Sequence, residues 1–227
     1  MKVYAIIPSG GKGIRANTAM PKQYLKFHGK ELIAYSIEVF QRSNLVDEII
    51  IAAQNEFFEL LDSIKKTYGF TKLSHIIEGG AERQYSVFNA LNSLECSDED
   101  IIIVHDAVRP LLPQNLLVNS IQTAKEFGSA VVAIKAKDTL IKGKEFVESY
   151  IDRKEIYYAQ TPQVFKYKII IDAFRRSQQE NFLGTDESML VKRAGYNIKI
   201  VEGSTLNFKI TTDDDIKLFE MISKPKL

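Results

Sequence analysis

The stretch from Val3 to Lys22 limits this chain to a small group of folds. An apolar run, V-Y-A-I-I-P, leads directly into three glycines within four positions, Gly10, Gly11 and Gly13. An uninterrupted apolar run of this kind is typical of a strand buried in a parallel sheet. Glycine allows positive φ and places no Cβ between a backbone N–H group and a ligand. The stretch therefore predicts an α/β sheet whose first strand ends in a loop close to a bound group.

The chemistry of that loop favours an anion. Successive backbone N–H groups that point one way form a concave anion site, and Arg15 and Lys22 add two cations beside it. No glycine here is followed by Lys-Ser or Lys-Thr, as a Walker A loop requires, and Ala16 replaces the third glycine of a dinucleotide fingerprint. We interpret the loop as a polyphosphate site, and a plain tight turn between strand and helix is the alternative.

Strand and helix patterns alternate along the rest of the chain. Regular alternation predicts a Rossmann-like, doubly wound, mostly parallel sheet. Because we find no linker and no repeat, we expect one domain over residues 1–227. After the first strand, the patterns predict strands at 47–53, 74–78, 101–105, 129–134 and 198–201, and helices at 32–40, 56–68, 83–94, 166–179, 185–194 and 213–222.

One segment departs from the alternation. Residues 137–152 alternate with period two about a Lys-Gly-Lys turn, which is the signature of a β-hairpin. A hairpin has no obvious place inside a parallel sheet, so we expect residues 136–158 to project as a β-arm. An isolated two-stranded arm is marginally stable and needs a partner surface, which homodimerisation supplies most simply. A hairpin folded back on its own domain is the alternative.

Composition narrows the class of protein. The net charge is only +1, whereas a nucleic-acid binder normally carries a basic excess. The single cysteine, Cys96, rules out an internal disulfide framework and fits a reducing compartment. We find no signal-peptide pattern and no apolar run near the about 20 residues that span a bilayer. We therefore expect a cytoplasmic protein that binds neither nucleic acid nor membrane.

The loops that follow the strands collect cations. Ligands of open α/β sheets bind at the carboxyl ends of the strands, so the residues just after each strand are the candidates for a site. A chain of nearly zero net charge that gathers arginine and lysine at one rim focuses its field on an anionic substrate. These candidates are Ser9 to Arg15, then Gly79, Gly80, Arg83 and Ser86, then Asp106, Ala107 and Arg109, and finally Lys209.

Asp106 is the one carboxylate in this set, and its role stays open. One possibility is an ion pair with Arg109. The other is a ligand role, in which Asp106 accepts a hydrogen bond from a sugar hydroxyl or approaches a Mg²⁺ that bridges phosphates. The preceding His105 fits a core position better than an acid or base. The chain carries no Ser-His-Asp spacing and no metal-ligand cluster pattern.

A series of motifs then identifies a family. The chain resembles the 2-C-methyl-D-erythritol 4-phosphate cytidylyltransferases from end to end. The opening motif alone also resembles sugar-phosphate nucleotidyltransferases in general, but the whole series in this order is specific. The motifs are S-G-G-K-G-I-R, P-K-Q-Y-L, E-G-G-A-E-R-Q-Y-S, V-H-D-A-V-R-P, K-D-T, I-D-R, Q-T-P-Q-V-F, T-D-E-S and V-E-G-S-T-L-N-F-K-I-T.

The resemblance implies transfer of CMP from CTP to an alditol phosphate, with Mg²⁺ or another divalent cation, in a homodimer whose arms exchange. Arg15 and Lys22 match cations at the α-phosphate, and Arg153 and Lys209 match the pair that positions the acceptor phosphate, Arg153 in the neighbouring subunit's site. The positions that match the CTP site are Ser9, Gly10, Gly11, Gly13, Gly80, Ser86 and Ala107, and those around the alditol phosphate are Asp106, Arg109, Thr139, Thr161 and Thr185.

Three departures from the family pattern keep alternatives open. This chain has Ser9-Gly10-Gly11 where the family usually has Ala-Ala-Gly, and Ala16 where the family usually has methionine. It has Ala81 where an aspartate is common in the family, which removes one ribose or base contact. Gly-Gly in the first loop also occurs in the related ribitol-5-phosphate cytidylyltransferases, although T-D-E-S and I-D-R match the methylerythritol enzymes better.

Two hypotheses come from other classes. A catalytically silent nucleotide-binding protein would have lost the four cations, which are present. A nicotinamide oxidoreductase would need an acidic residue after the second strand, where this chain has Ala52-Ala53-Gln54.

Overall fold

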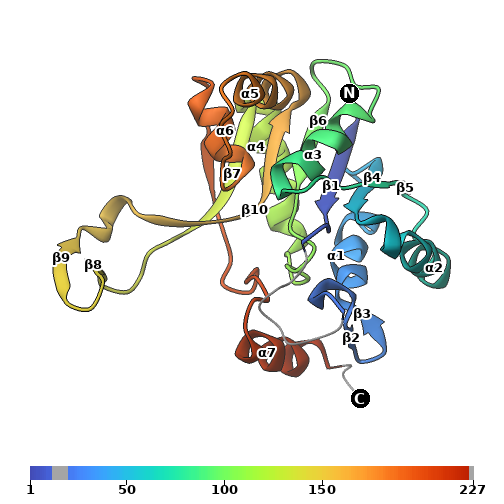
Figure 1. Cartoon of the computed structure of the whole chain (residues 1–227), viewed down its shortest axis with the longest axis horizontal. Helices are drawn as coiled ribbons and strands as arrows, with labels where there is room; N and C mark the ends of the chain where they lie inside the picture. Colours follow the sequence, from blue (N-terminus) through green and yellow to red (C-terminus); the bar gives the residue numbers. More distant parts are fainter. Residues whose placement is uncertain (12–19, 225–227) are drawn as a thin grey trace.

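A computed structural model of the chain describes residues 1–11 and 20–224 (Figure 1). Its centre is a seven-stranded sheet with strand order β11-β7-β10-β6-β1-β4-β5. Neighbouring strands are parallel except at β10, which is antiparallel to both β6 and β7. The strands are β1 (Val3–Pro8), β4 (Glu48–Ala53), β5 (Leu73–Glu78), β6 (Ile101–Val104), β7 (Ser129–Lys135), β10 (Tyr157–Lys166) and β11 (Lys199–Glu202).

Helices cover both faces of this sheet. Helices α1, α2 and α4 pack on one face, and α3, α5 and α6 pack on the other. The predicted doubly wound, mostly parallel architecture is therefore confirmed. The helices are α1 (Leu32–Gln41), α2 (Phe58–Tyr68), α3 (Arg83–Asn92), α4 (Gln114–Phe127), α5 (Tyr167–Gln179), α6 (Glu187–Arg193) and α7 (Asp213–Ser223), with short 3-10 turns η1 (Lys22–Tyr24), η2 (Asn55–Phe57) and η3 (Arg153–Glu155).

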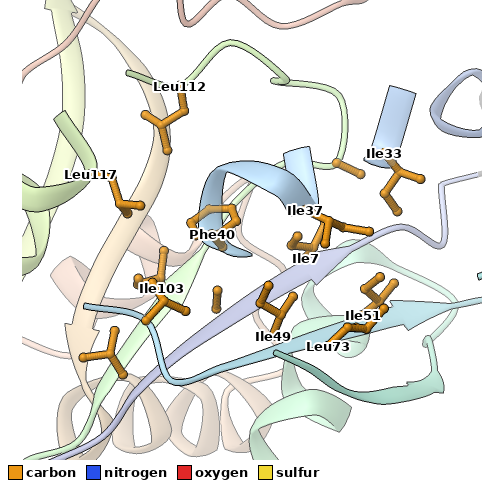
Figure 2. Close-up of a cluster of buried hydrophobic side chains, with 14 of the residues drawn as sticks. Ile7, Ile33, Ile37, Phe40, Ile49, Ile51, Leu73, Ile103, Leu112 and Leu117 are labelled. Atoms are coloured by element: carbon orange, nitrogen blue, oxygen red, sulfur yellow. The ribbon is translucent and has the colours of Figure 1, made fainter. Parts of the chain in front are cut away.

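The first strand shows why this sequence forms a hydrophobic core on each face of the sheet. Successive side chains of a strand point to opposite faces, so Ala5 and Ile7 join one core while Tyr4 and Ile6 join the other. Figure 2 shows part of the first core, in which Ile7 lies among side chains of α1 and β4. Full burial of one such side chain contributes about 1.5–3 kcal/mol. A strand that is apolar on both faces therefore belongs at the sheet centre, between β4 and β6.

A third, smaller core lies beyond the carboxyl ends of the strands. There α7 packs on a short hairpin formed by β2 (Lys26–Phe27) and β3 (Lys30–Glu31), with Phe27 and Phe219 in edge contact at 5.4 Å between ring centroids. Thr212 and Asp215 form a capping box that starts α7. This cluster holds η1 and the segment before α7 beside the strand ends (Figure 1).

The predicted hairpin is present, although residues 157–158 of the expected arm belong to β10 of the central sheet. Strands β8 (Leu140–Gly143) and β9 (Val147–Ile151) pair only with each other and project away from the sheet (Figure 1). Phe146 and Tyr150 are 83% and 72% exposed. The hairpin therefore does not fold back on its own sheet, and it carries large apolar side chains into solvent.

Two elements of the sheet region were not predicted from the sequence, namely β10 and α4. Strand β10 contains Pro162, which cannot donate to a ladder and argues against a central strand. The structure accommodates it in a break of register between Ala159 and Gln163. No helix in the described part of the chain has the length and apolar character needed to cross a membrane.

Candidate active site

A cavity of about 580 Å³ opens at the carboxyl ends of β1, β5 and β6. We call it the strand-end cavity. The loop after β1, the turn after β5, the loop after β6, η1 and the segment before α7 all contribute to it. Its described lining residues are Pro8, Ser9, Gly10, Gly11, Lys22, Gln23, Gln54, Gly80, Ala81, Glu82, Arg83, Ser86, Asp106, Ala107, Val108 and Lys209.

One wall of the strand-end cavity is bare backbone. The Ser9 N–H donates to the Ala52 carbonyl at 2.7 Å, which carries the β1 ladder on to the first glycine. On the neighbouring turn, the Gly80 N–H donates to Ser86 Oγ at 3.0 Å. A Cβ on Gly80 would lie 2.3 Å from Tyr85 Cβ, so only glycine lets α3 pack this closely against the turn. Those residues of the predicted CTP site that the structure describes therefore line one cavity.

The strand-end cavity also carries charge, centred on Asp106. This carboxylate is 8% exposed and lies within 3.0 Å of Lys209 Nζ, 3.2 Å of Arg83 Nη2 and 3.3 Å of Arg109 Nε. Burial alone would raise its pKa, but the cations of Arg83, Lys209 and Arg109 together hold the pKa well below its usual range. Asp106 is therefore an ionised acceptor embedded in positive charge.

Behind Arg83 lies a second buried carboxylate. Glu187, in the first turn of α6, is 1% exposed and accepts from Arg83 Nη1 at 2.5 Å. Burial raises the pKa of Glu187. The pKa of Arg83 is raised, because attraction to Glu187 and Asp106 outweighs its own burial. Because 104 residues separate Glu187 from Arg83, no local sequence pattern signalled the pair.

Asp106 is also fixed through its backbone. Since the Arg109 carbonyl can only accept, His105 donates to it through Nε2 at 3.0 Å, and its Nδ1 accepts from the Thr161 hydroxyl at 3.0 Å. Thr161 Oγ1 in turn accepts from the Asp106 N–H at 3.1 Å. Burial lowers the pKa of His105 to about 4, so the ring is neutral at physiological pH. His105 is thus a core residue, as expected.

Lys22 reaches the strand-end cavity from η1, which follows Pro21 directly. Its Nζ lies 3.5 Å from the Thr211 carbonyl, in the segment before α7. Arg109 is 9% exposed and donates through Nη1 to the Asn207 carbonyl at 2.8 Å. Arg109 and Thr161 therefore lie behind Asp106 rather than on the cavity surface.

Five predicted site residues lie elsewhere or outside the described residues. Thr139 and Arg153 are exposed on the arm, where Arg153 donates to the Lys137 carbonyl. Thr185 lines a separate, open hollow of about 600 Å³ between α6 and the sheet edge. Arg15 and Gly13 fall within residues 12–19, outside the described part of the chain. Conversely, Gln23, Gln54 and Glu82 line the cavity without having been predicted.

This arrangement suits a polyanion better than acid–base chemistry. The described lining residues include no histidine and no cysteine. Glycine backbone and a cation cluster in one cavity can hold phosphates, while an ionised carboxylate can accept from a hydroxyl group.

Comparisons with known proteins agree over the whole length. A family model for 2-C-methyl-D-erythritol 4-phosphate cytidylyltransferase matches residues 3–224. The chain is 40% identical over 231 residues to the enzyme of that name from Geobacter metallireducens, covering 100% of both chains. It is 39% identical over 223 residues to the one from Clostridium acetobutylicum, covering 97% of this chain and 96% of the relative.

Solved structures give the same result. The 2-C-methyl-D-erythritol 4-phosphate cytidylyltransferase of Francisella tularensis superposes with a TM-score of 0.83 at 29% identity, covering 97% of this chain and 99% of the other. The Thermus thermophilus enzyme gives a TM-score of 0.81 at 26% identity, with 98% of each chain covered. Sequence and fold agree from end to end, and the chain accordingly belongs to the 2-C-methyl-D-erythritol 4-phosphate cytidylyltransferase (IspD) family of nucleotidyltransferases.

Proposed function

We propose that the strand-end cavity binds CTP and 2-C-methyl-D-erythritol 4-phosphate and transfers CMP between them. The products are the CDP-alditol, an isoprenoid precursor of the non-mevalonate route, and pyrophosphate. One observation carries the proposal: three cations surround the ionised carboxylate of Asp106, in a cavity that glycine backbone also lines. That combination supports binding of two phosphate groups together with a hydroxyl-bearing acceptor.

The reaction needs positioning more than proton transfer. An oxygen of the acceptor phosphate forms a bond to the α-phosphorus of CTP, and the bond from that phosphorus to the β-phosphate oxygen breaks, so that pyrophosphate leaves with the electron pair. The attacking monoester is already ionised at neutral pH, since its second pKa is about 6. The barrier is therefore repulsion between anions and misalignment, which fixed cations reduce.

The residues of the proposed site have separate tasks in this scheme. Lys22 meets charge at the α-phosphate, as Arg15 would. The backbone at Gly10 and Gly11 holds phosphates, while Gly80, Ser86 and Ala107 border the cytidine. Asp106 accepts from a hydroxyl of the alditol, and Lys209 holds its phosphate. Because Arg109 and Thr161 contact Asp106 rather than the cavity, they support that carboxylate from behind.

A divalent cation such as Mg²⁺ would be carried by the triphosphate. Among the described residues, no group of three or more His, Cys, Asp or Glu side chains gathers to hold a metal. Both oxygens of Asp106 already contact cations, so this carboxylate is a poor further ligand. When bound, the ion would neutralise the departing pyrophosphate.

We also propose that the protein is a cytoplasmic homodimer. The arm that carries Thr139 and Arg153 projects from its own sheet (Figure 1), which supports a role for both residues at the cavity of a neighbouring subunit. The exposed Phe146 and Tyr150 on the same arm give it an apolar surface to bury. A composition with a single cysteine fits a reducing compartment.

Release of pyrophosphate from CTP tests the proposal. We expect turnover with 2-C-methyl-D-erythritol 4-phosphate and much weaker turnover with ribitol 5-phosphate, since the relatives named above are methylerythritol enzymes. Preference for ribitol 5-phosphate would reassign the acceptor. Binding of CTP without turnover of either acceptor would leave the silent nucleotide-binding protein as the better description.

A further inference from the structure

Gln23 lies between Lys22 and Tyr24 in η1, and its side chain is tied to the glycine loop. It is 5% exposed, and its Nε2 donates to the Ser9 carbonyl at 2.8 Å and to the Gly11 carbonyl at 3.1 Å. Both protons of the amide therefore go to backbone of the loop after β1. A side chain with two donors on one nitrogen is needed to hold two carbonyl groups at once.

This contact fixes where the loop's amide groups point. In a trans peptide, the carbonyl and the following N–H point in opposite directions. A Ser9 carbonyl directed at Gln23 therefore turns the Gly10 N–H the other way. In residues 1–11 and 20–224, the Gly10 N–H donates to no acceptor, while Gly10 lines the strand-end cavity.

Tyr24 provides a second anchor to the same loop. Its hydroxyl lies 2.8 Å from Ser9 Oγ, and its ring stacks on Phe57 at 4.3 Å between centroids. Burial raises the pKa of Tyr24 to about 12, so the hydroxyl stays neutral. Lys22 lies in the same turn. The turn η1 and the loop after β1 therefore form one unit, which carries the Gly10 N–H donor and the Lys22 cation.

We infer that Gln23 is a positioning residue for phosphate binding: it holds the Ser9 and Gly11 carbonyls away from the cavity, so that the Gly10 N–H meets the triphosphate in register with Lys22. The inference rests on the proposed binding of CTP. It assigns a function to a buried side chain whose amide group is bonded to the loop after β1.

The test compares Gln23→Met, which has similar length and no donor, with Tyr24→Phe, which loses only a hydroxyl group. We expect Gln23→Met to weaken CTP binding about tenfold or more, the effect of losing a hydrogen bond to a charged group. Cytidine, measured as a competitive inhibitor, should bind unchanged because it has no phosphate. Tyr24→Phe should keep CTP affinity within about threefold, since Gln23 still orients the loop.

A merely structural role would give a different result. Equal weakening of CTP and cytidine in Gln23→Met, or unchanged CTP binding at an unchanged melting temperature, would overturn the inference. The unmodified protein gives a second test, because CTP should shift the Gly10 amide proton resonance downfield, and no shift would also overturn it. Wild-type protein that binds no CTP would refute the proposed function and this inference together, whereas equal CTP binding by wild type and variant refutes the inference alone.

Discussion

The neutral ring of His105 holds Asp106 in place, and its protonation should loosen the fold. The pKa of this ring is lowered to about 4, below its ordinary value of 6.5. Between these values the unfolded chain binds the proton and the folded chain does not, so stability is complete above pH 6.5 and falls as the pH drops toward 4. A proton on Nδ1 would also face Thr161 Oγ1 with a donor where an acceptor is needed.

Comparison with His105→Gln isolates this contribution. We expect the free energy of unfolding of the wild type to fall by about 2 kcal/mol more than that of the variant between pH 7 and pH 4.5. The pKa of Asp106 is lowered and that of Glu187 is raised, but both groups remain in the variant and cancel in the comparison. Urea unfolding at the two pH values measures the effect, and parallel losses would contradict it.

Lys22→Ala tests the proposed role at the α-phosphate. We expect kcat to fall about 100-fold or more with a smaller change in KM for CTP, because a fixed cation acts mainly where charge develops. Lys26→Ala is a matched control, since Lys26 is an exposed lysine on β2 that pairs with Glu31 at 3.4 Å. Steady-state kinetics of both variants measure the difference. A near-normal kcat in Lys22→Ala would contradict the proposed role of Lys22 at the α-phosphate.

At the scale of single residues, the sequence predicted which residues lie at the cavity better than it predicted which side chains contact one another. The rule that ligands gather at strand ends brought Asp106, Ala107 and Lys209 into one cavity, as the structure has them. It could not show that Thr161 turns to His105, or that Arg83 pairs with Glu187, because those contacts join residues 56 and 104 positions apart. Such pairs follow from packing of whole elements and leave no local pattern.

Among the elements, α7 supports the segment before it, which contributes Lys209 to the strand-end cavity. Phe219 is fully buried, with edge contacts to Phe27 at 5.4 Å and to Tyr35 at 5.2 Å. Phe219→Ala should lower the free energy of unfolding by about 3–5 kcal/mol, the cost of a large cavity in a core. Leu218→Ala, at a 41% exposed neighbour, should cost under about 1 kcal/mol. Urea denaturation distinguishes them, and equal losses would show that α7 is not packed in this way.

The elements also show where sequence patterns succeed. Most strands and helices with clear apolar spacing were predicted to within a few residues, because burial on the two faces of the sheet determines that spacing. Helix α4 was missed, although its buried Leu117, Ile121 and Ala124 recur at helical spacing. Strand β10 departs from the rule, since Pro162 interrupts its ladder and its direction is opposite to that of its neighbours. The position of an antiparallel strand inside a parallel sheet depends on the whole topology rather than on its own residues.

At the scale of the whole molecule, the arm carries two residues proposed for the site, Thr139 and Arg153, neither of which lines the strand-end cavity of its own chain. Arg153 lies in η3 at the base of the arm and is exposed. In a two-fold dimer with exchanged arms, each strand-end cavity would combine Lys22 of one subunit with Arg153 of the other. The sequence alone predicted the hairpin, but its partner surface can be learned only from the assembly.

Complementation tests this exchange. Lys22→Ala and Arg153→Ala should each be nearly inactive alone, whereas a mixed dimer holds one cavity with both residues intact and one with neither. Random reassortment makes about half the dimers mixed, so about a quarter of wild-type activity should return, by symmetry counting. The two variants are co-refolded, mixed dimers are demonstrated by differential tagging, and CTP turnover is assayed. If turnover stays at the level of the parents although mixed dimers form, then Arg153 does not act across the interface, and the arm only holds the subunits together.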